Sequence, residues 1–163
     1  MKFIVDAMLG RTSRWLRMLG FEAKYVKASD DDLLDLTKKE NRILLTSDLE
    51  LSQRARSRGL DTFYVTGKDE PEKLAKITQH FNIKLEIDIN SSRCPKCGSS
   101  ITSIEKKDVS TQVPKGSLMY HNSFWVCTGC GKIYWQGKHW EKINEMLTQV
   151  KELQITNDHI TTL

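Results

Sequence analysis

Aspartates follow several of the apolar runs that are typical of buried strands, and their chemistry is the most informative in the chain. Asp6 ends the run Phe-Ile-Val near the N-terminus, and Asp48 comes two residues after the run Arg-Ile-Leu-Leu-Thr. Asp30 opens the helix expected after a second strand, and Asp69 follows a fourth strand. In an open parallel sheet, ligands gather at the edge formed by the carboxyl ends of the strands. We therefore expect these four acids to converge at that edge.

Carboxylate oxygens suit Mg²⁺ or Mn²⁺, which keep several waters and bridge to phosphate groups. Such ions promote phosphodiester cleavage by activating water and by stabilising the leaving oxygen. Simpler roles are open for most of the acids. Residues 30–32 favour a helix N-terminus, Asp48 is placed to cap a helix, and Asp69 fits a surface loop. Asp6 is the hardest to explain in this way, because a carboxylate that ends an apolar strand has little structural use.

All the cysteines lie in the second half of the chain, as two Cys-x2-Cys pairs separated by 29 residues. Each pair is followed by a glycine, which lets the chain turn tightly so that amides can approach the thiolates. Four thiolates around one ion make a closed tetrahedral site, which is structural and not catalytic. The alternative is a pair of disulfides, which a reducing compartment disfavours. We predict a structural Zn²⁺ held by Cys94, Cys97, Cys127 and Cys130.

Short strands and helices alternate along the first half. Strands are expected at residues 2–6, 22–26, 42–46, 62–65 and 84–87, with amphipathic helices between them. This β-α-β-α-β-α-β-α-β order predicts an α/β fold with a parallel sheet and helices on both faces. The polar break Asn90-Ser91-Ser92 is the natural boundary between a domain of residues 1–90 and a zinc ribbon with a C-terminal helix in residues 91–163. Helical periodicity places that last helix at 140–153.

The composition is that of a soluble globular protein, with 39% hydrophobic and 28% charged residues. No apolar run approaches the roughly 20 residues needed to span a bilayer, and the N-terminus does not resemble a signal peptide. We expect a cytoplasmic protein. The net charge is +4, and most of the excess lies beyond residue 90, where 9 Lys and Arg face 6 Asp and Glu. This bias permits nucleic-acid binding without demanding it.

Three stretches carry a resemblance to known nucleases: residues 3–11 (FIVDAMLGR), 14–20 (RWLRMLG) and 43–48 (ILLTSD). They are similar to the PIN-like nuclease superfamily. With the ribbon, residues 2–142 resemble the "mutator-seven C-terminal" RNase domain family. The resemblance implies a PIN-like three-layer α/β/α fold, an acidic divalent-metal site, and single-stranded or structured RNA as substrate. It places the family's acids on Asp6, Asp30 and Asp48, with Asp31 as a substitute for Asp30 and Asp69 as a fourth acid.

Basic and aromatic side chains are candidates for holding RNA. Arg11 and Arg14 lie on the helix after Asp6, where they could bind phosphate. The alternative is that these arginines, with Arg17, form a solvated basic face, while Trp15 on the same helix is expected in the core. In the ribbon, the candidates are Lys115, Lys132, Tyr134, Trp135, Lys138, His139 and Trp140. Two of these, Trp135 and Trp140, could instead cover the junction between the domains.

The resulting hypothesis is a metal-dependent ribonuclease, an endonuclease, in which Asp6, Asp30 and Asp48 bind Mg²⁺ or Mn²⁺ and Asp69 assists. The alternative of another class is a non-catalytic RNA-binding adaptor in RNA processing or in ribosome or tRNA handling. A toxin-like PIN ribonuclease is a third option, although nothing in the chain points to an antitoxin partner. The sequence does not identify the RNA, the mode of cleavage (within the chain or from an end) or the oligomeric state.

Overall fold

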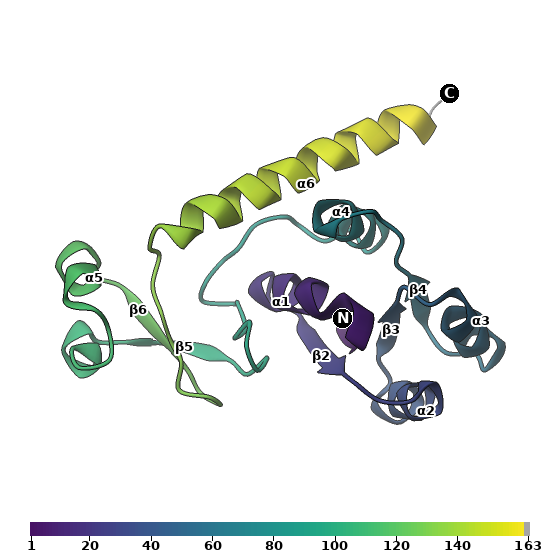
Figure 1. The fold of residues 1–163 in the computed structure, drawn as a ribbon, viewed down its shortest axis with the longest axis horizontal. Helices are drawn as coiled ribbons and strands as arrows, with labels where there is room; N and C mark the ends of the chain where they lie inside the picture. Colours follow the sequence, from purple (N-terminus) through teal and green to yellow (C-terminus); the bar gives the residue numbers. More distant parts are fainter. Residues whose placement is uncertain (162–163) are drawn as a thin grey trace.

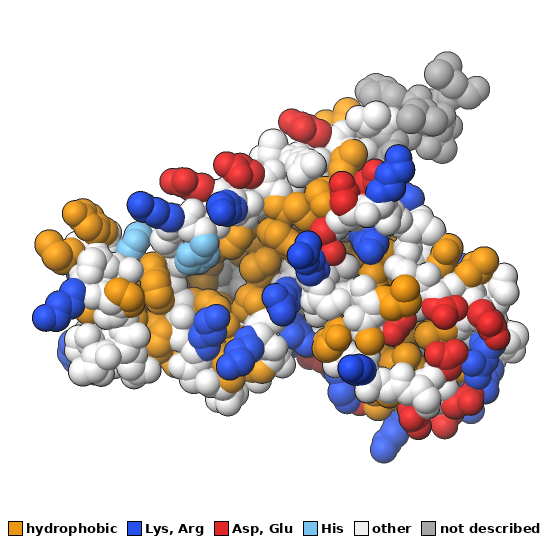
Figure 2. Space-filling model, viewed as in Figure 1, with side chains coloured by type: hydrophobic (Ala, Val, Ile, Leu, Met, Phe, Trp, Pro, Cys, Tyr) orange, Lys and Arg blue, Asp and Glu red, His pale blue; other side chains and the backbone are white. Residues whose placement is uncertain are grey.

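The computed structural model describes the backbone of residues 1–161 and the side chains of residues 1–156. An α/β domain (residues 2–80) lies at one end of the molecule and a ribbon (residues 93–134) at the other, with one long helix running above both (Figures 1 and 2). Within the described residues, no helix is long and apolar enough to cross a membrane.

The α/β domain is built on four parallel strands in the order β2-β1-β3-β4. The two central strands have helices on both sides, so their side chains are buried whichever way they point. This explains why both read as continuous apolar runs. The strands are β1 (Lys2–Asp6), β2 (Glu22–Val26), β3 (Ile43–Thr46) and β4 (Thr62–Tyr64).

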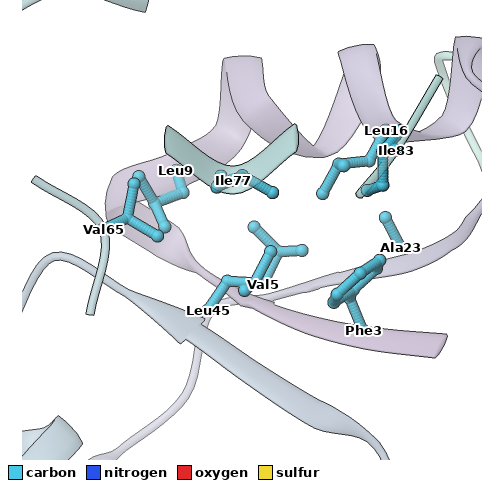
Figure 3. Close-up of a cluster of buried hydrophobic side chains, with 9 residues drawn as sticks. All are labelled: Phe3, Val5, Leu9, Leu16, Ala23, Leu45, Val65, Ile77 and Ile83. Carbon is cyan, nitrogen blue, oxygen red and sulfur yellow. The ribbon is translucent and has the colours of Figure 1, made fainter. Parts of the chain in front are cut away.

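Helices cover both faces of this sheet and give three layers. Phe3 and Val5 point to one face, where they pack with Leu16 of α1 and Ile77 of α4 (Figure 3). Ile4 points to the other face, against the leucines of α2 and α3. The predicted α/β architecture is therefore confirmed. The helical elements are η1 (Ala7–Leu9), α1 (Gly10–Met18), α2 (Asp30–Glu40), α3 (Leu49–Ser57) and α4 (Glu70–His80).

The fifth strand predicted at residues 84–87 is wrong. This segment is extended but pairs with no strand in the described part of the chain. Its alternation has another cause: Leu85 is buried against Leu147 and Val150 of the last helix, while Lys84 and Glu86 are exposed and pair with each other. One face packed against a helix produces the same period-two pattern as one face packed in a sheet.

The ribbon is an antiparallel sheet of three short strands in the order β5-β6-β7. Between the first two strands, two short helices enclose a small core of Val109, Val113 and Phe124. Gly98 and Gly131 follow the cysteine pairs with φ of 85° and 70°, which side chains disfavour. The elements are β5 (Ile101–Ile104), η2 (Lys106–Val109), α5 (Lys115–Tyr120), β6 (Phe124–Cys127) and β7 (Ile133–Tyr134).

The C-terminal helix α6 (His139–Thr161) leaves the ribbon and returns to the α/β domain, where it lies along α4 (Figure 1). Leu147 and Val150 pack with Leu74 of α4 in one apolar cluster. Gln154 Nε2 also donates a hydrogen bond to Thr78 Oγ1 at 2.8 Å. The helix predicted at 140–153 is present and runs further, to Thr161. Residues 162 and 163 of the predicted C-terminal domain lie outside the described residues.

Candidate active site and metal centre

Asp6 and Asp48 meet at the carboxyl ends of neighbouring strands. Asp6 ends β1 and is only 8% exposed. Its Oδ2 accepts a hydrogen bond of 2.8 Å from the hydroxyl of Thr46, the last residue of β3. The same hydroxyl oxygen accepts a 3.0 Å hydrogen bond from the backbone amide of Asp48. A fully buried threonine thus joins the two candidate acids.

Asp48 also caps helix α3, which is the structural role considered for it from the sequence. Its Oδ1 accepts a hydrogen bond of 3.0 Å from the amide of Leu51, in the first turn of α3. The side chain nevertheless stays exposed at the edge of the sheet. A carboxylate fixed by one amide still has lone pairs for a cation. The two roles considered for Asp48 are therefore compatible.

Asp30 and Asp31 contact arginines of α3. Arg54 donates to Asp30 Oδ2 at 3.0 Å and to Asp31 Oδ1 at 2.6 Å. Arg58 adds a second donor to Asp31 at 3.0 Å. These ion pairs join the first turn of α2 to α3, which is the structural alternative for this acidic run. They do not bring Asp30 against Asp6.

Asp69 caps α4, since its Oδ1 accepts a 3.0 Å hydrogen bond from the amide of Glu72. Its neighbour Glu70 is half-buried, and Glu70 Oε1 accepts a 2.7 Å hydrogen bond from Thr12 on α1. Glu70 is an acid at this edge that the sequence pattern did not distinguish from loop surface. The position just before Pro71 indicates only a helix start. The contact with Thr12, 58 residues away in the chain, has no local signal.

The carboxylate oxygens are suitable ligands for a hard divalent ion, but the acids do not form a complete set of ligands around one point. Within the described residues, the one group of three or more potential ligands lying within 4.8 Å of one another consists of the cysteines. Mg²⁺ commonly uses one or two carboxylates, with waters and substrate phosphates completing its shell. The linked pair Asp6 and Asp48 fits that requirement, and a site of three converged acids is not formed.

Of the three arginines on α1, two are exposed and one is buried. Arg11 and Arg14 line a depression of about 490 Å³, together with Lys68, Asp69 and Glu70. This places the two predicted phosphate-binding residues beside acids that follow β4.

Arg17, in contrast, is 7% exposed, so the alternative of a solvated basic face is wrong for this arginine. Its Nε donates to the carbonyl of Ala23 at 2.8 Å, and its Nη1 donates to the carbonyls of Pro95 and Lys96 at 3.1 and 3.3 Å. Burial lowers the pKa of Arg17, and the nearby Cys94 and Cys97 raise it by a smaller amount. Arg17 thereby ties the ribbon to the α/β domain. Trp15, on the same helix, packs against the apolar cluster under α6, as expected.

The four cysteines converge as predicted. The sulfurs of Cys94 and Cys130 are 3.7 Å apart, and those of Cys97 and Cys127 are 3.3 Å apart. A disulfide needs about 2.05 Å, and all four cysteines are free. A zinc ion with Zn–S bonds of about 2.3 Å requires tetrahedral sulfur separations of roughly 3.8 Å. The residues present therefore fit a closed structural zinc site.

Hydrogen bonds around the sulfur of Cys97 favour its thiolate form. Contacts from the Ser99 side chain and amide lower the pKa of Cys97 to about 6. Burial raises the pKa of Cys127 to about 11, although the amides of Cys130 and Gly129 act in the opposite direction. Burial, followed by its contact with Cys94, also raises the pKa of Tyr134. Its hydroxyl, 3.0 Å from the Cys94 sulfur, thus stays protonated and can donate to this candidate zinc ligand.

The aromatic side chains of the ribbon are only partly available to a ligand. Trp135 packs against Phe124 at a ring separation of 6.3 Å. It also lines, with Trp125 and Trp140, an apolar pocket of about 130 Å³ between the ribbon, α1 and the start of α6. That position agrees with the alternative role for Trp135 and Trp140, at the junction. Lys115 and Lys138 are exposed and do not line this pocket.

These features define a three-layer α/β protein with carboxylates at the carboxyl edge of its sheet and an appended four-cysteine ribbon. A family model described as the Mut7-C RNAse domain matches residues 1–147, and the chain belongs to this family. Membership indicates a ribonuclease-type function with RNA as substrate. The resemblance of residues 2–142 to this RNase domain family is thus confirmed. No curated protein and no solved structure is significantly similar to the chain.

Proposed function

We propose that the protein is a metal-dependent endoribonuclease of the PIN-like class, with its active site at the carboxyl edge of the α/β sheet. Asp6 and Asp48 would hold Mg²⁺ or Mn²⁺. Asp30 is the third ligand that the family resemblance implies, although its Oδ2 pairs with Arg54 in this structure and the side chain does not lie against Asp6. Asp69 would assist directly or through water, and Arg11 and Arg14 would bind the phosphate backbone.

The observation that carries this proposal is the buried carboxylate of Asp6. Asp6 as a whole residue is only 8% exposed, and burying an aspartate costs free energy unless its charge is compensated. The hydroxyl of Thr46 supplies one hydrogen bond, but no cation pairs with Asp6 within the described residues. A bound divalent ion would supply the missing positive charge. Membership of an RNase family supports an RNA phosphodiester as the substrate of such an ion.

Each side chain then has a defined task. A divalent ion at this edge would activate water and stabilise charge on the leaving oxygen. Thr46 orients the Asp6 carboxylate by donating to one of its oxygens, and the cap contact with Leu51 orients Asp48. Arg11 and Arg14 are exposed next to Asp69 and Glu70, where guanidinium groups can hold a phosphate in two-pronged contacts. No serine, cysteine or histidine nucleophile is required.

The decisive experiment incubates the zinc-loaded full-length protein with a mixed RNA pool, with Mg²⁺, with Mn²⁺, or with neither ion. We expect cleavage only when a divalent ion is added, with product ends inside the RNA chains. Mapped ends confined to the RNA termini would contradict the endonuclease. Omitting the ion, instead of chelating it, keeps the ribbon loaded and isolates the proposed catalytic metal.

A non-catalytic RNA-binding adaptor is the second candidate. It is favoured by the ion pairs that hold Asp30 and Asp31 on Arg54, away from Asp6. The adaptor predicts tight RNA binding and no product under any metal condition. For either function we propose a cytoplasmic location, because a reducing compartment keeps four free cysteines available as metal ligands.

A further inference from the structure

A groove of about 760 Å³ separates α1 of the α/β domain from the ribbon. Lys and Arg side chains gather on the visible face where the two parts meet (Figure 2). Both sides of the groove contribute cations, and none of its lining residues in the described part of the chain is acidic. The basic and aromatic lining residues are Arg14, Arg17, Tyr25, Lys96, Lys132, Tyr134, Trp135 and His139.

The cations of this groove have no carboxylate partners in the described part of the chain. Arg14, Lys96 and Lys132 form no ion pair within the described residues, although Lys132 Nζ lies 5.6 Å from the ring centre of Tyr134. Elsewhere on the α/β domain, Arg54 and Arg58 are neutralised by aspartates of α2. Uncompensated cations facing one another across a groove give a positive potential that attracts a polyanion.

Tyr25 adds an exposed aromatic ring to the same groove. It lies near the carboxyl end of β2, with 43% of its surface exposed. The ring rests on Gly10: a side-chain carbon at that residue would lie 3.3 Å from the ring atom Cε2. Glycine thus allows the ring to lie close against the start of α1. Exposed aromatic rings beside a basic groove are the features with which proteins hold unpaired bases.

The groove leads toward the acidic edge of the sheet. Arg14 lines both this groove and the depression that contains Arg11, Asp69 and Glu70. One arginine is therefore shared between the basic groove and the proposed active site. A chain bound in the groove would pass this arginine to reach the acids.

The two walls of the groove are held at a fixed separation. Arg17 bonds from α1 to the carbonyls of Pro95 and Lys96 in the first Cys-x2-Cys loop. Arg93 Nη2 also donates to Glu22 Oε1 on β2 at 3.1 Å. Because these contacts join the ribbon directly to the α/β domain, the groove is preformed, and binding spends little free energy on ordering it.

We infer that this groove holds single-stranded RNA and guides it to the carboxyl edge of the sheet, an inference that rests on the proposed nuclease function. Lys96 and Lys132 bind the phosphates from the ribbon side, Arg14 binds them from α1, and Tyr25 stacks on a base. Bases in a duplex are already stacked and paired, so they leave nothing for Tyr25 to contact. A single strand can contact both the phosphate-binding cations and the ring of Tyr25.

The test measures binding separately from cleavage. Zinc-loaded full-length protein is titrated into a fluorescent oligouridine RNA of about 12 nucleotides, in buffer without Mg²⁺ or Mn²⁺, at several salt concentrations. Replacing Lys96 and Lys132 together by glutamine should make the plot of log affinity against log salt shallower by about 1.4, at about 0.7 for each phosphate that is no longer neutralised. The matched control replaces Lys38 and Lys39 of α2, two exposed lysines on the opposite face of the sheet, and should keep the wild-type slope.

A second variant tests stacking independently of charge. Tyr25→Ala should weaken oligouridine binding about fivefold or more at every salt concentration, with an unchanged slope, while Tyr25→Phe should bind as wild type. A Lys96/Lys132 variant with the wild-type slope, or a wild-type protein that binds duplex RNA more tightly than oligouridine, would overturn the inference. This test measures binding and not cleavage. If the protein shows these binding effects but cuts no RNA in the cleavage experiment above, the proposed nuclease is refuted and the RNA-binding groove still stands.

Discussion

At the scale of single residues, the acids differ in how their charge is balanced. Asp30 and Asp31 have arginine partners, and Asp48 and Asp69 cap helices. Asp6 alone among these five is buried, with a neutral hydroxyl as its partner. Its charge is therefore the one most dependent on a bound cation, and its substitution tests the proposed site most directly.

Replacing Asp6 by asparagine keeps the shape of the side chain and removes the negative charge. RNA cleavage should fall by about a hundredfold or more, the usual effect of removing a metal ligand or a charge-stabilising group. Affinity for RNA should stay the same or rise, because repulsion of the phosphates decreases. Cleavage rates at saturating Mn²⁺ and binding without divalent ions measure the two effects. Asp61→Asn, at an exposed residue before β4, is the control. Normal cleavage by Asp6→Asn would refute the assignment.

Thr46 is a positioning residue, since its hydroxyl contacts both Asp6 and the amide of Asp48. Thr46→Val preserves the volume of the buried side chain but leaves these two groups without their partner. We expect a stability loss of about 1–3 kcal/mol and a weaker affinity for Mn²⁺, measured by titration of the activity. Thr46→Ser should restore the Mn²⁺ affinity. If valine lowers stability but not Mn²⁺ affinity, Thr46 has a structural role only.

At the scale of the elements, predictions from sequence succeeded where a signal is local. The apolar runs of β1 and β3, the amphipathic helices and the two Cys-x2-Cys pairs are patterns of neighbouring residues, and all are present in the structure. The unpaired segment at 84–87 shows the limit, because packing against α6 produces the alternation expected of a strand. A residue pattern reports which face is buried and not what covers it.

The candidate site was less predictable for the same reason. Placement after strands located Asp6 and Asp48, whereas their link through Thr46 depends on which strands are neighbours. The contacts of Arg54 with Asp30, of Thr12 with Glu70 and of Arg17 with Pro95 join residues 24, 58 and 78 positions apart. Each depends on the relative placement of whole elements, which local spacing does not encode.

Arg17 therefore provides a test at the element scale. Its buried guanidinium bonds to one carbonyl in the α/β domain and two in the ribbon. Arg17→Ala leaves these carbonyls without their charged donor and should lower the free energy of unfolding by about 3 kcal/mol. Arg14→Ala, one turn away and exposed, should change it by less than about 0.5 kcal/mol. Urea unfolding followed by circular dichroism compares the two; equal stabilities would show that Arg17 does not hold the ribbon.

At the scale of the whole molecule, two kinds of stabilisation are combined. The α/β domain has apolar clusters on both faces of its sheet, whereas the ribbon has a core of three buried side chains and the cysteine cluster. Helix α6 starts at the ribbon and packs on α4. The chain thus passes from the α/β domain through the segment that carries the four cysteines and returns to pack on the α/β domain.

Removal of zinc should consequently affect the ribbon far more than the rest. Metal binding and folding are coupled in small cysteine sites, so we expect one zinc per chain by elemental analysis and loss of ribbon structure on chelation. The far-ultraviolet circular dichroism should keep most of its helical signal, because α1 to α4 belong to the sheet domain and Leu147 and Val150 hold α6 on α4. Tryptophan fluorescence should change strongly, since Trp125, Trp135 and Trp140 line the junction pocket.

A matched variant separates zinc removal from other effects of the chelator. Cys97→Ser removes an exposed ligand with little change in volume and should give the metal-free spectrum without any chelator. In that variant, Trp15 remains packed in the apolar cluster under α6, so part of the native fluorescence should persist. Purified wild-type protein without zinc would contradict the metal site. Complete loss of the helical signal on chelation would instead show that the α/β domain depends on the ribbon for its own stability.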